Sequence, residues 1–281
     1  MAEQKVAVVT GTSSGIGLET AIHLAKNGFK TYATMRNLSK SEAIKQRAQA
    51  ESVSIEITQL DVNDDTSVKG AIDTIIEKEG RIDVLVNNAG YALLGAVEDL
   101  SSAEVSDQFN TNVLGPYRTA REVLPIMRKQ NSGRIITISS VAGFMGMPAG
   151  SAYAASKFAV EGFTESLRQE VSKFGIHACV VEPGAIKTPI MESSPMAKKA
   201  QENPTYSELY QGLGKTMQDM VENHSSPPSV VAEQVLEAAT SENPGTRYTA
   251  GEDAKMMAKA RKEMSDKDFE NLIMTSFFAQ Q

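Results

Sequence analysis

Residues 6–17 read VAVVTGTSSGIG, a short β-branched apolar run that passes into a glycine-rich segment. The apolar run predicts a strand that is buried on both faces. After the glycines, apolar residues recur at helical spacing from Leu18 to Ala25 and stop before Gly28, which predicts a helix. Strand, glycine-rich turn and helix in this order form the context of a dinucleotide site, where helix amides face a pyrophosphate. Alone, such a turn also fits a purely conformational use of glycine.

The rest of the chain repeats this alternation. Strands are predicted at 30–35, 53–60, 82–86, 134–138, 176–181 and 246–250. Helices are predicted at 39–50, 64–78, 101–130, 153–175 and 229–239. Short connections between alternating strands and helices predict an α/β fold of Rossmann type: a doubly wound parallel sheet of about seven strands with helices on both faces. One domain is expected to span residues 1–281.

Two stretches depart from the alternation. Residues 190–228 lose clean periodicity and are rich in Met, Ser and Pro, including Met191, Met196, Met217 and Met220. This composition predicts a substrate lid, although simple filler packing would suit it equally well. Residues 252–281 are expected to form an amphipathic helical extension, which would cover a substrate pocket, pack on a neighbouring subunit or complete the core.

Composition excludes several classes of protein. The net charge of −7 argues against a nucleic-acid partner, whose binding surface would be basic. No apolar run approaches the roughly 20 residues that span a bilayer. The strand-like run begins at Val6, so we expect no signal peptide and a cytoplasmic protein. The single cysteine excludes an internal disulfide, and three scattered His residues give no metal-ligand spacing, so no metal is expected.

Three polar residues are candidates for proton transfer. Tyr153 and Lys157 are four residues apart and would share one face of a helix, while Ser140 follows the strand predicted at 134–138. All three could therefore reach one substrate oxygen. A free tyrosine has a pKa of about 10, and we expect a nearby ammonium to lower it towards the working range. Taken singly, the pair is more often an ordinary surface pair and the serine a turn residue.

Other polar or small residues stand where strands end. Arg36 follows the second strand with no acid beside it, a position that favours the 2′-phosphate of NADP over the ribose hydroxyl of NAD. Asp61 and Val62 follow the third strand as a rim for an adenine ring. Asn112 lies close to Gly115 and Pro116 within the segment predicted as a helix, which breaks the local rules for a stable helix.

Together the motifs resemble the short-chain dehydrogenase/reductase family over about residues 4–250. They are Thr10-Gly11-x-x-x-Gly15-Ile16-Gly17, Asn87-Asn88-Ala89-Gly90, Asn112, Ser140, Tyr153-x-x-x-Lys157 and Pro183-Gly184. The stretches 32–37 and 153–162 are similar to the hydroxysteroid and retinol dehydrogenase branch. One departure is that Thr12-Ser13-Ser14 holds no basic residue, which many NADP users carry in this turn, so NADP is expected to be preferred while NAD remains possible.

The resemblance implies roles for individual residues. Tyr153 would be the general acid or base, Lys157 would lower its pKa and bind the nicotinamide ribose, Ser140 would hold the substrate oxygen, and Asn112 would position a water that relays protons. The cofactor would lie against Gly11, Ser13, Ser14, Gly15, Ile16, Gly17, Arg36, Asp61, Val62, Asn88, Ala89, Gly90, Tyr153, Lys157, Pro183, Gly184, Ile186 and Thr188.

We therefore expect an NADP-preferring oxidoreductase that interconverts an alcohol with its ketone or aldehyde by direct hydride transfer. The substrate is expected to be apolar or bulky, like a steroid, a retinoid or a lipid. A catalytically silent NADP-binding sensor is the alternative, and epimerisation or dehydration on the same fold is a third. Relatives are commonly homodimers or homotetramers, and we expect one of these assemblies.

Overall fold

In the described part of the chain, seven parallel strands form one sheet in the order β3-β2-β1-β4-β5-β6-β7. The computed structural model describes residues 4–189 and 194–278. The strands are β1 (Val6–Thr10), β2 (Lys30–Met35), β3 (Ile55–Gln59), β4 (Val84–Asn87), β5 (Gly133–Ile138), β6 (Ile176–Pro183) and β7 (Arg247–Ala250). The strand order reverses direction between β1 and β4, as in a doubly wound sheet. The predicted fold class is confirmed.

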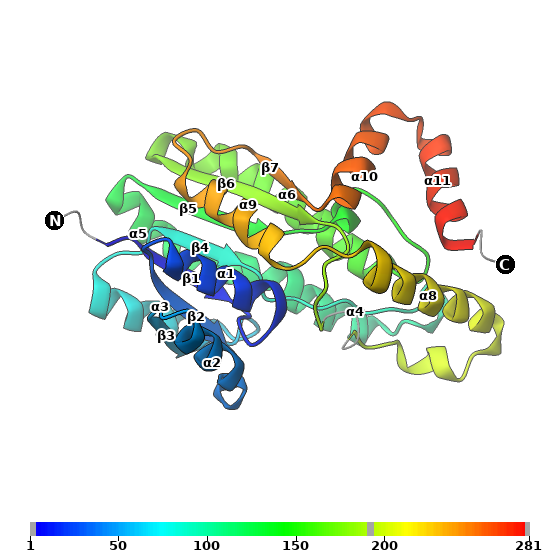
Figure 1. Cartoon of the computed structure of the whole chain (residues 1–281), viewed down its shortest axis with the longest axis horizontal. Coiled ribbons are helices and arrows are strands. Elements are labelled where there is room, and N and C mark those ends of the chain that lie inside the picture. Colours follow the sequence, from blue (N-terminus) through cyan, green and yellow to red (C-terminus); the bar gives the residue numbers. More distant parts are fainter. Residues whose placement is uncertain (1–3, 190–193, 279–281) are drawn as a thin grey trace.

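Helices cover both faces of this sheet (Figure 1). They are α1 (Gly15–Lys26), α2 (Glu42–Ala50), α3 (Asp65–Glu79), α4 (Ser102–Phe109), α5 (Gly115–Gln130), α6 (Ser151–Val171), α8 (Ser207–Asp219), α9 (Ser229–Thr240), α10 (Glu252–Glu263) and α11 (Asp266–Phe278). Residues alternate along β1, so Ala7 and Val9 pack with α1, α2 and α9, while Val6 and Val8 pack with α3, α5 and α6. Every residue of β1 is buried, as its apolar composition predicts.

Local signals set the ends of α3 where the sequence predicts them. The Asp64 carboxylate accepts hydrogen bonds from the backbone N–H groups of Thr66 and Ser67, and Gly80 ends the helix with φ +70°. Asp at the N-cap satisfies free amides of the first turn, and glycine adopts the left-handed conformation that ends a helix without a Cβ penalty.

The segment 101–130, predicted as one helix, contains a change of helical type. A π turn, Asn110–Leu114, separates α4 from α5. It places Asn112 inside the turn, and Pro116 falls in the first turn of α5, directly after the π turn. The violations of helix rules around Asn112 are thus explained by a π turn, a feature that often marks a functional position.

Residues 190–228, predicted as an irregular lid, contain more helical structure than expected in the part that is described. The described part contains α8, a π turn (Met220–His224) and short 3₁₀ turns. Apolar residues at helical spacing in α8 pack on Leu94 and Ala149, which gives the segment a core of its own. Met191 lies outside the described residues. The extension after residue 252 is helical as predicted but consists of two helices, α10 and α11.

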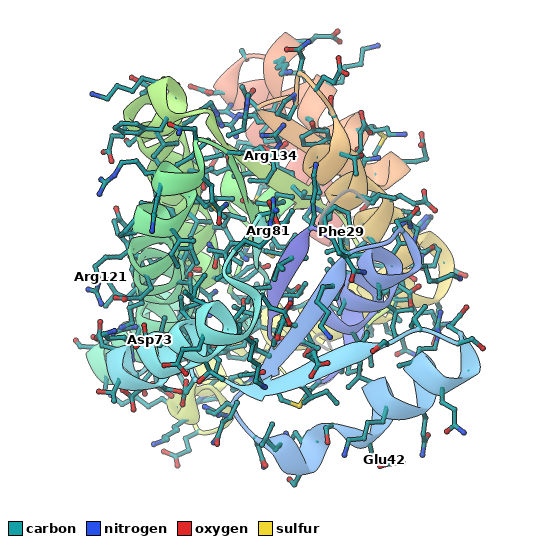
Figure 2. All side chains as sticks on the ribbon, turned by 90° about the vertical axis from the view of Figure 1, so that its left-hand side faces the viewer. Phe29, Glu42, Asp73, Arg81, Arg121 and Arg134 are labelled. Carbon is teal, nitrogen blue, oxygen red and sulfur yellow. The ribbon has the colours of Figure 1, made fainter. Side chains whose placement is uncertain are left out.

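Figure 1 places α8, α10 and α11 beyond the carboxyl ends of the strands, while Figure 2 views the opposite end of the sheet. There the charged side chains of Glu42, Asp73 and Arg121 lie on the outer surface of the helices. Across residues 4–189 and 194–278, no helix is long and apolar enough to cross a membrane.

Candidate active site

The carboxyl ends of β1, β4, β5 and β6 lie side by side and carry the predicted motifs. Gly11 follows β1 with φ +70°, and a Cβ there would lie 2.8 Å from the Cα of Ala89, which follows β4. A Cβ on Gly17 would clash with the carbonyl oxygen of Gly11 and with Asn88 Nδ2. Both positions therefore require glycine, because the turn lies directly against the Asn-Asn-Ala-Gly segment.

Side chains of two strand ends hold this glycine turn in place. Asn88 Nδ2 donates to the backbone oxygens of Thr10 at 2.8 Å and Gly11 at 3.0 Å. The Thr10 hydroxyl accepts hydrogen bonds from the N–H groups of Asn88 and Ala89, each at 3.0 Å. The amide of Asn88, assigned by resemblance to a cofactor contact, is thus used to support the turn. Thr10 supports the turn but is not among the site residues predicted from the sequence. Its hydroxyl at the end of a buried strand is the feature that could have identified it.

The N-terminus of α1 has its amides available to a ligand. Ser14 precedes the helix in an extended conformation, and within the described residues its side chain makes no capping bond and the first turn has no acid. A Cβ on Gly15, with φ +57°, would lie 3.2 Å from Thr188 of the loop after β6. Free amides, a positive helix end and two glycines that leave room fit the pyrophosphate of a dinucleotide.

The residues expected to contact the adenosine part of the cofactor follow β2 and β3. The Arg36 side chain is exposed, and in the described structure its guanidinium has no hydrogen bond or ion pair. Asp61 accepts a hydrogen bond from the N–H of Asn63 at 3.0 Å, and Val62 is buried. Arg118 of α5 donates to the Val62 carbonyl at 2.9 Å, a supporting contact that the sequence pattern did not reveal.

The three catalytic candidates converge at the end of β5. Ser140 follows this strand, and its hydroxyl accepts a hydrogen bond from the N–H of Ala142 at 3.1 Å. Tyr153 and Lys157 lie one turn apart on α6, with Lys157 Nζ 5.7 Å from the centre of the tyrosine ring. Lys157 is buried, and Nζ donates to the carbonyl of Ile138 at 2.8 Å. The structure therefore brings together the residues that the sequence proposes.

Electrostatics at this centre differ from the expectation in one respect. Burial raises the pKa of Tyr153, and a hydrogen bond with Ser140 offsets only part of this rise. Burial also lowers the pKa of Lys157 to about 8, against the opposing effect of the Glu161 carboxylate. The expected lowering of the tyrosine pKa is therefore wrong for the protein without bound cofactor: the pKa is raised, with burial as the largest cause. At neutral pH the phenol is therefore protonated and ready to donate a proton.

Asn112 is buried in the π turn and is fully engaged by the protein. Nδ2 donates to the Tyr91 carbonyl at 2.9 Å and to Ser156 Oγ at 3.0 Å, and Oδ1 accepts from the Tyr91 N–H at 3.1 Å. Ser156 directly precedes Lys157. Both amide hydrogens are thus used, so the side chain offers no N–H to the water implied by the resemblance and instead links the segment after β4 to α6.

The loop after β6 connects the site to the C-terminal part of the chain. Ile186 is buried and pairs as an isolated bridge with Ser226, and the Thr188 hydroxyl donates to the Ile186 carbonyl at 3.3 Å. Gly184 accommodates the Asp253 carboxylate, with which a Cβ at Gly184 would collide. Pro183 and Gly184 thus mark a point where α10 approaches the end of β6.

Two apolar clusters lie beyond the site. Met145, Phe269 and Ile273 are buried together, so the loop after Ser140 packs on α11. Leu94, Ala149 and Leu213 form the second cluster beneath α8. The α8 helix is held further by Tyr210, whose hydroxyl contacts the buried Asp99 carboxylate and accepts from the N–H of Ala96 at 2.9 Å. These clusters pack α8 and α11 against the segments that follow β4 and β5.

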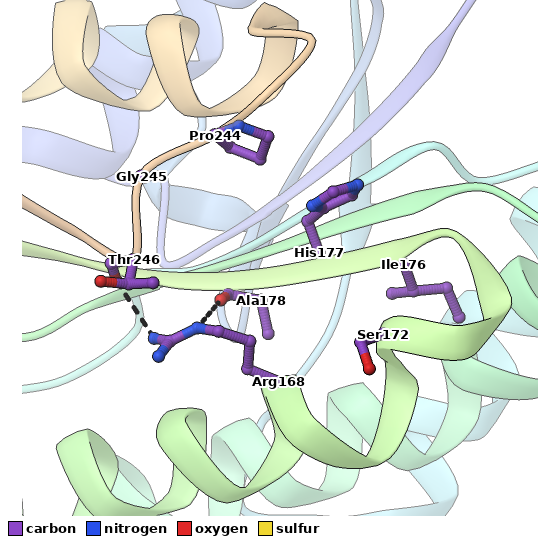
Figure 3. Close-up of a pocket in the computed structure, with 8 residues that line it drawn as sticks. All are labelled: Arg168, Ser172, Ile176, His177, Ala178, Pro244, Gly245 and Thr246. Atoms are coloured by element: carbon purple, nitrogen blue, oxygen red, sulfur yellow. Dashed lines mark hydrogen bonds between the residues drawn. The ribbon is translucent and has the colours of Figure 1, made fainter.

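A cavity of about 80 Å³ lies elsewhere, at the amino end of β6 (Figure 3). Arg168 reaches across it and donates to the carbonyl of Ala178 at 2.8 Å and to that of Thr246 at 3.1 Å. The guanidinium therefore joins β6 to the residue that precedes β7. Because the catalytic candidates stand at the other end of the strands, this cavity is not their substrate pocket.

The chain is similar in sequence and in fold to several known proteins. The family model for short chain dehydrogenases matches residues 5–199. Human 17-beta-hydroxysteroid dehydrogenase type 1 is 39% identical over 86% of this chain and 76% of its own, and human retinol dehydrogenase 8 is 44% identical over 66% and 60%. A solved structure of an actinorhodin polyketide ketoreductase variant with NADPH has a TM-score of 0.76 and 28% identity, over 89% of this chain and 96% of that one.

The predicted family and the similarity to the hydroxysteroid and retinol dehydrogenase branch are confirmed by these matches. The matched residues include the glycine turn, Asn112, Ser140, Tyr153 and Lys157. This chain belongs to the short-chain dehydrogenase family and is an NAD(P)-dependent oxidoreductase.

Proposed function

We propose that the protein interconverts an alcohol with its ketone or aldehyde and that Tyr153 is the general acid and base. The observation that carries this proposal is the meeting of Ser140, Tyr153 and Lys157 at the end of β5, with a phenol that burial keeps protonated. A sensor that only binds nucleotide has no need of a half-buried phenol beside a buried amine. The glycine turn and the amides of α1 stand next to this centre to hold a dinucleotide.

The chain's residues manage the proton and the orientation of the substrate. Bound nicotinamide supplies or accepts the hydride. Ser140 holds the substrate oxygen, and Tyr153 donates a proton to it in reduction or removes one in oxidation. Lys157 places positive charge beside the phenol, which stabilises the phenolate that remains after donation. Asn112 fixes Ser156 and the Tyr91 segment, and thereby the register of α6 at Lys157.

The preferred cofactor in this proposal is NADP. Arg36 is exposed at the end of β2 and free of ion pairs within the described residues, so its guanidinium is available to a 2′-phosphate. No Asp or Glu stands at this strand end to hold a ribose hydroxyl. The actinorhodin ketoreductase variant, which has a similar fold, was solved with NADPH. Because the glycine turn adds no further cation, the preference is moderate rather than strict.

The substrate in this proposal is apolar and bulky, and residues 190–228 with α11 serve as its cover. Support comes from the apolar clusters around Met145 and Leu213, which flank the site from α11 and α8. Relatives named for hydroxysteroids and retinol agree with a substrate of this size. Apolar walls favour such a ligand through the area that it removes from water.

Assembly as a homodimer or homotetramer through the helices around Asn112 and Tyr153 is part of the proposal. Leu114, Tyr117 and Phe158 lie on these helices and are 47%, 50% and 49% exposed. Large apolar side chains exposed in this way are typical of protein interfaces. Sedimentation analysis of Tyr117→Glu would give a monomer if this surface forms the contact, and an unchanged mass would refute it.

A screen of ketones, aldehydes and alcohols of graded size, followed by NADPH absorbance, tests the activity. We expect stoichiometric NADPH consumption with a bulky apolar ketone or aldehyde and weaker turnover with small ones. Binding of NADPH without consumption across the whole screen would favour the sensor. Conversion of a substrate with no net change in NADPH would favour epimerisation or dehydration.

A further inference from the structure

Behind the catalytic lysine, α6 carries a buried acid. Glu161 lies four residues after Lys157, so the two side chains share one face of the helix. Glu161 is 6% exposed and Lys157 is 8% exposed. Burial of two opposite charges one turn apart is costly unless each has a partner.

Arg247 of β7 connects this acid to a second one. Its Nη1 donates to Glu161 Oε2 and, at 2.9 Å, to Glu182 Oε1 on β6. Glu182 is 3% exposed. One guanidinium thus pairs with two buried carboxylates, and with Lys157 the four groups carry no net charge. The four groups lie on α6, β6 and β7, so the packing of α6 on the sheet sets their relative positions.

The other groups around Glu161 are few. Ser139 and Glu161 face the same point, since a Cβ on Gly143 would lie 2.6 Å from Ser139 Oγ and 3.0 Å from Glu161 Oε1. Glu165, one turn further along α6, lies 3.6 Å from Arg247 Nη2 and its side chain is 58% exposed. From α10, the Asp253 carboxylate contacts the Gly184 segment that follows Glu182.

The surroundings of Glu161 and of Lys157 include groups that raise each pKa and groups that lower it. The pKa of Glu161 is raised overall: burial raises it most and Glu182 raises it further, while Ser139 and the Arg247 guanidinium lower it in part. For Lys157, burial lowers the pKa and the Glu161 charge raises it. Among the described residues the ammonium also lies over the Tyr153 ring and donates to the Ile138 carbonyl, neither of which carries a formal charge while the phenol is protonated.

We propose that Glu161, paired with Arg247, is a positioning residue whose carboxylate favours the positively charged form of Lys157 behind the reacting groups. This inference rests on the proposed function, because a charged Lys157 matters when Tyr153 becomes a phenolate. Without the carboxylate, a buried ammonium would lose its proton at lower pH. The phenolate would then lack the charge that stabilises it.

The test is the pH profile of alcohol oxidation by Glu161→Gln, with Glu165→Gln as the matched control. Both variants remove a carboxylate near Arg247 from α6, but only Glu161 is buried beside Lys157. We expect the alkaline limb of kcat/KM in Glu161→Gln to move to lower pH by about one unit, the lower end of the shift that a nearby charge causes. The limb of Glu165→Gln should stay in place. An unmoved limb in Glu161→Gln, or equal shifts in both variants, would overturn the proposal.

A measurement without substrate separates this inference from the proposed function. A lysine whose pKa is lower in the folded state than in the unfolded one makes the protein more stable as pH rises between the two values. The loss of stability of Glu161→Gln relative to wild type should therefore shrink between about pH 7 and about pH 10 in urea unfolding. A loss that is constant with pH contradicts the role of Glu161 even in an active enzyme. A wild type that consumes no NADPH would instead refute the function.

Should Glu161→Gln not fold, Glu182→Gln carries the test. Removing the Glu182 charge leaves Arg247 to Glu161 alone and strengthens its ionised form. The alkaline limb of Glu182→Gln should then stay or move to higher pH. A shift to lower pH in this variant would overturn the proposal.

Discussion

The Asp253 carboxylate, in the first turn of α10, accepts a hydrogen bond from the backbone N–H of Ala185, with Oδ2 and N 2.6 Å apart. This bond joins the C-terminal extension to the loop after β6, which also contains Ile186 and Thr188. Gly251, with φ +107°, gives the chain the bend that turns α10 towards this loop. The extension therefore supports a segment of the proposed cofactor site.

Asp253→Ala tests this support. Removal of the acceptor leaves the Ala185 N–H without its partner, which should cost about 1–3 kcal/mol in the free energy of unfolding. KM for NADPH should rise several-fold because the loop loses its anchor. Glu252→Ala is the control, since the Glu252 side chain is 89% exposed and pairs only with Lys255 in the described structure. Unchanged KM in Asp253→Ala, with the stability loss present, would show that the loop does not contact the cofactor.

Two glycines on helices have opposite expected responses to a methyl group. Gly17→Ala would drive a Cβ into the Gly11 carbonyl and Asn88, so we expect loss of NADPH binding and about 1–3 kcal/mol of destabilisation. Gly70→Ala, in the interior of α3 with open space around it, should stabilise the protein by about 0.5–1 kcal/mol. Fluorescence titration with NADPH and urea unfolding give both quantities. Normal NADPH affinity in Gly17→Ala would refute the close approach of this turn to the cofactor.

Arg36→Asp should shift preference from NADP towards NAD. The substitution removes the cation at the end of β2 and supplies an acid that can bind the ribose hydroxyl. The ratio of kcat/KM for NADPH to that for NADH should fall by one to two orders of magnitude, roughly the effect of losing one or two charge-assisted hydrogen bonds. Lys40→Asp, with the same charge change in the exposed turn after β2, should leave the ratio unchanged. Equal ratios in wild type and Arg36→Asp would show that Arg36 does not bind the 2′-phosphate.

The buried thiol of Cys179 should make the free energy of unfolding depend on pH in the alkaline range. Burial in β6 raises the pKa of its thiol to about 12, while an unfolded cysteine ionises near pH 8.5. A group with a raised folded pKa contributes stability at low pH and loses it as pH rises between the two values. In urea unfolding, Cys179→Ala should therefore be destabilised less at about pH 10 than at about pH 8, by about 1–2 kcal/mol. An equal effect at both pH values would contradict the raised pKa.

The sequence predicts the strands of the sheet well because the signals for each strand lie within a short segment of the chain. Several strands are short apolar runs rich in β-branched residues, such as Val6–Thr10, and Gly11, Asp61 and Asn88 follow soon after the ends of β1, β3 and β4. The catalytic trio follows from spacing on one helix and one strand end. These signals need no knowledge of distant contacts.

Features that depend on contacts between distant residues were not predictable. Glu161 and Arg247 are separated by 86 residues, and neither looks unusual within its own segment. The apolar face of α8 is short, and its packing partners Leu94 and Ala149 lie far away in the sequence, so the segment looked irregular. The raised pKa of Tyr153 follows from burial, which spacing alone does not reveal.

The role of Tyr153 as the general acid is tested by NADPH oxidation by Tyr153→Phe with the best carbonyl substrate from the screen. The variant keeps the ring but removes the proton donor, so turnover should fall by about 10²–10⁴, as for lost acid–base catalysis. NADPH binding should remain near that of wild type, because Lys157 and the glycine turn are untouched. Turnover within a few-fold of wild type would contradict Tyr153 as the general acid.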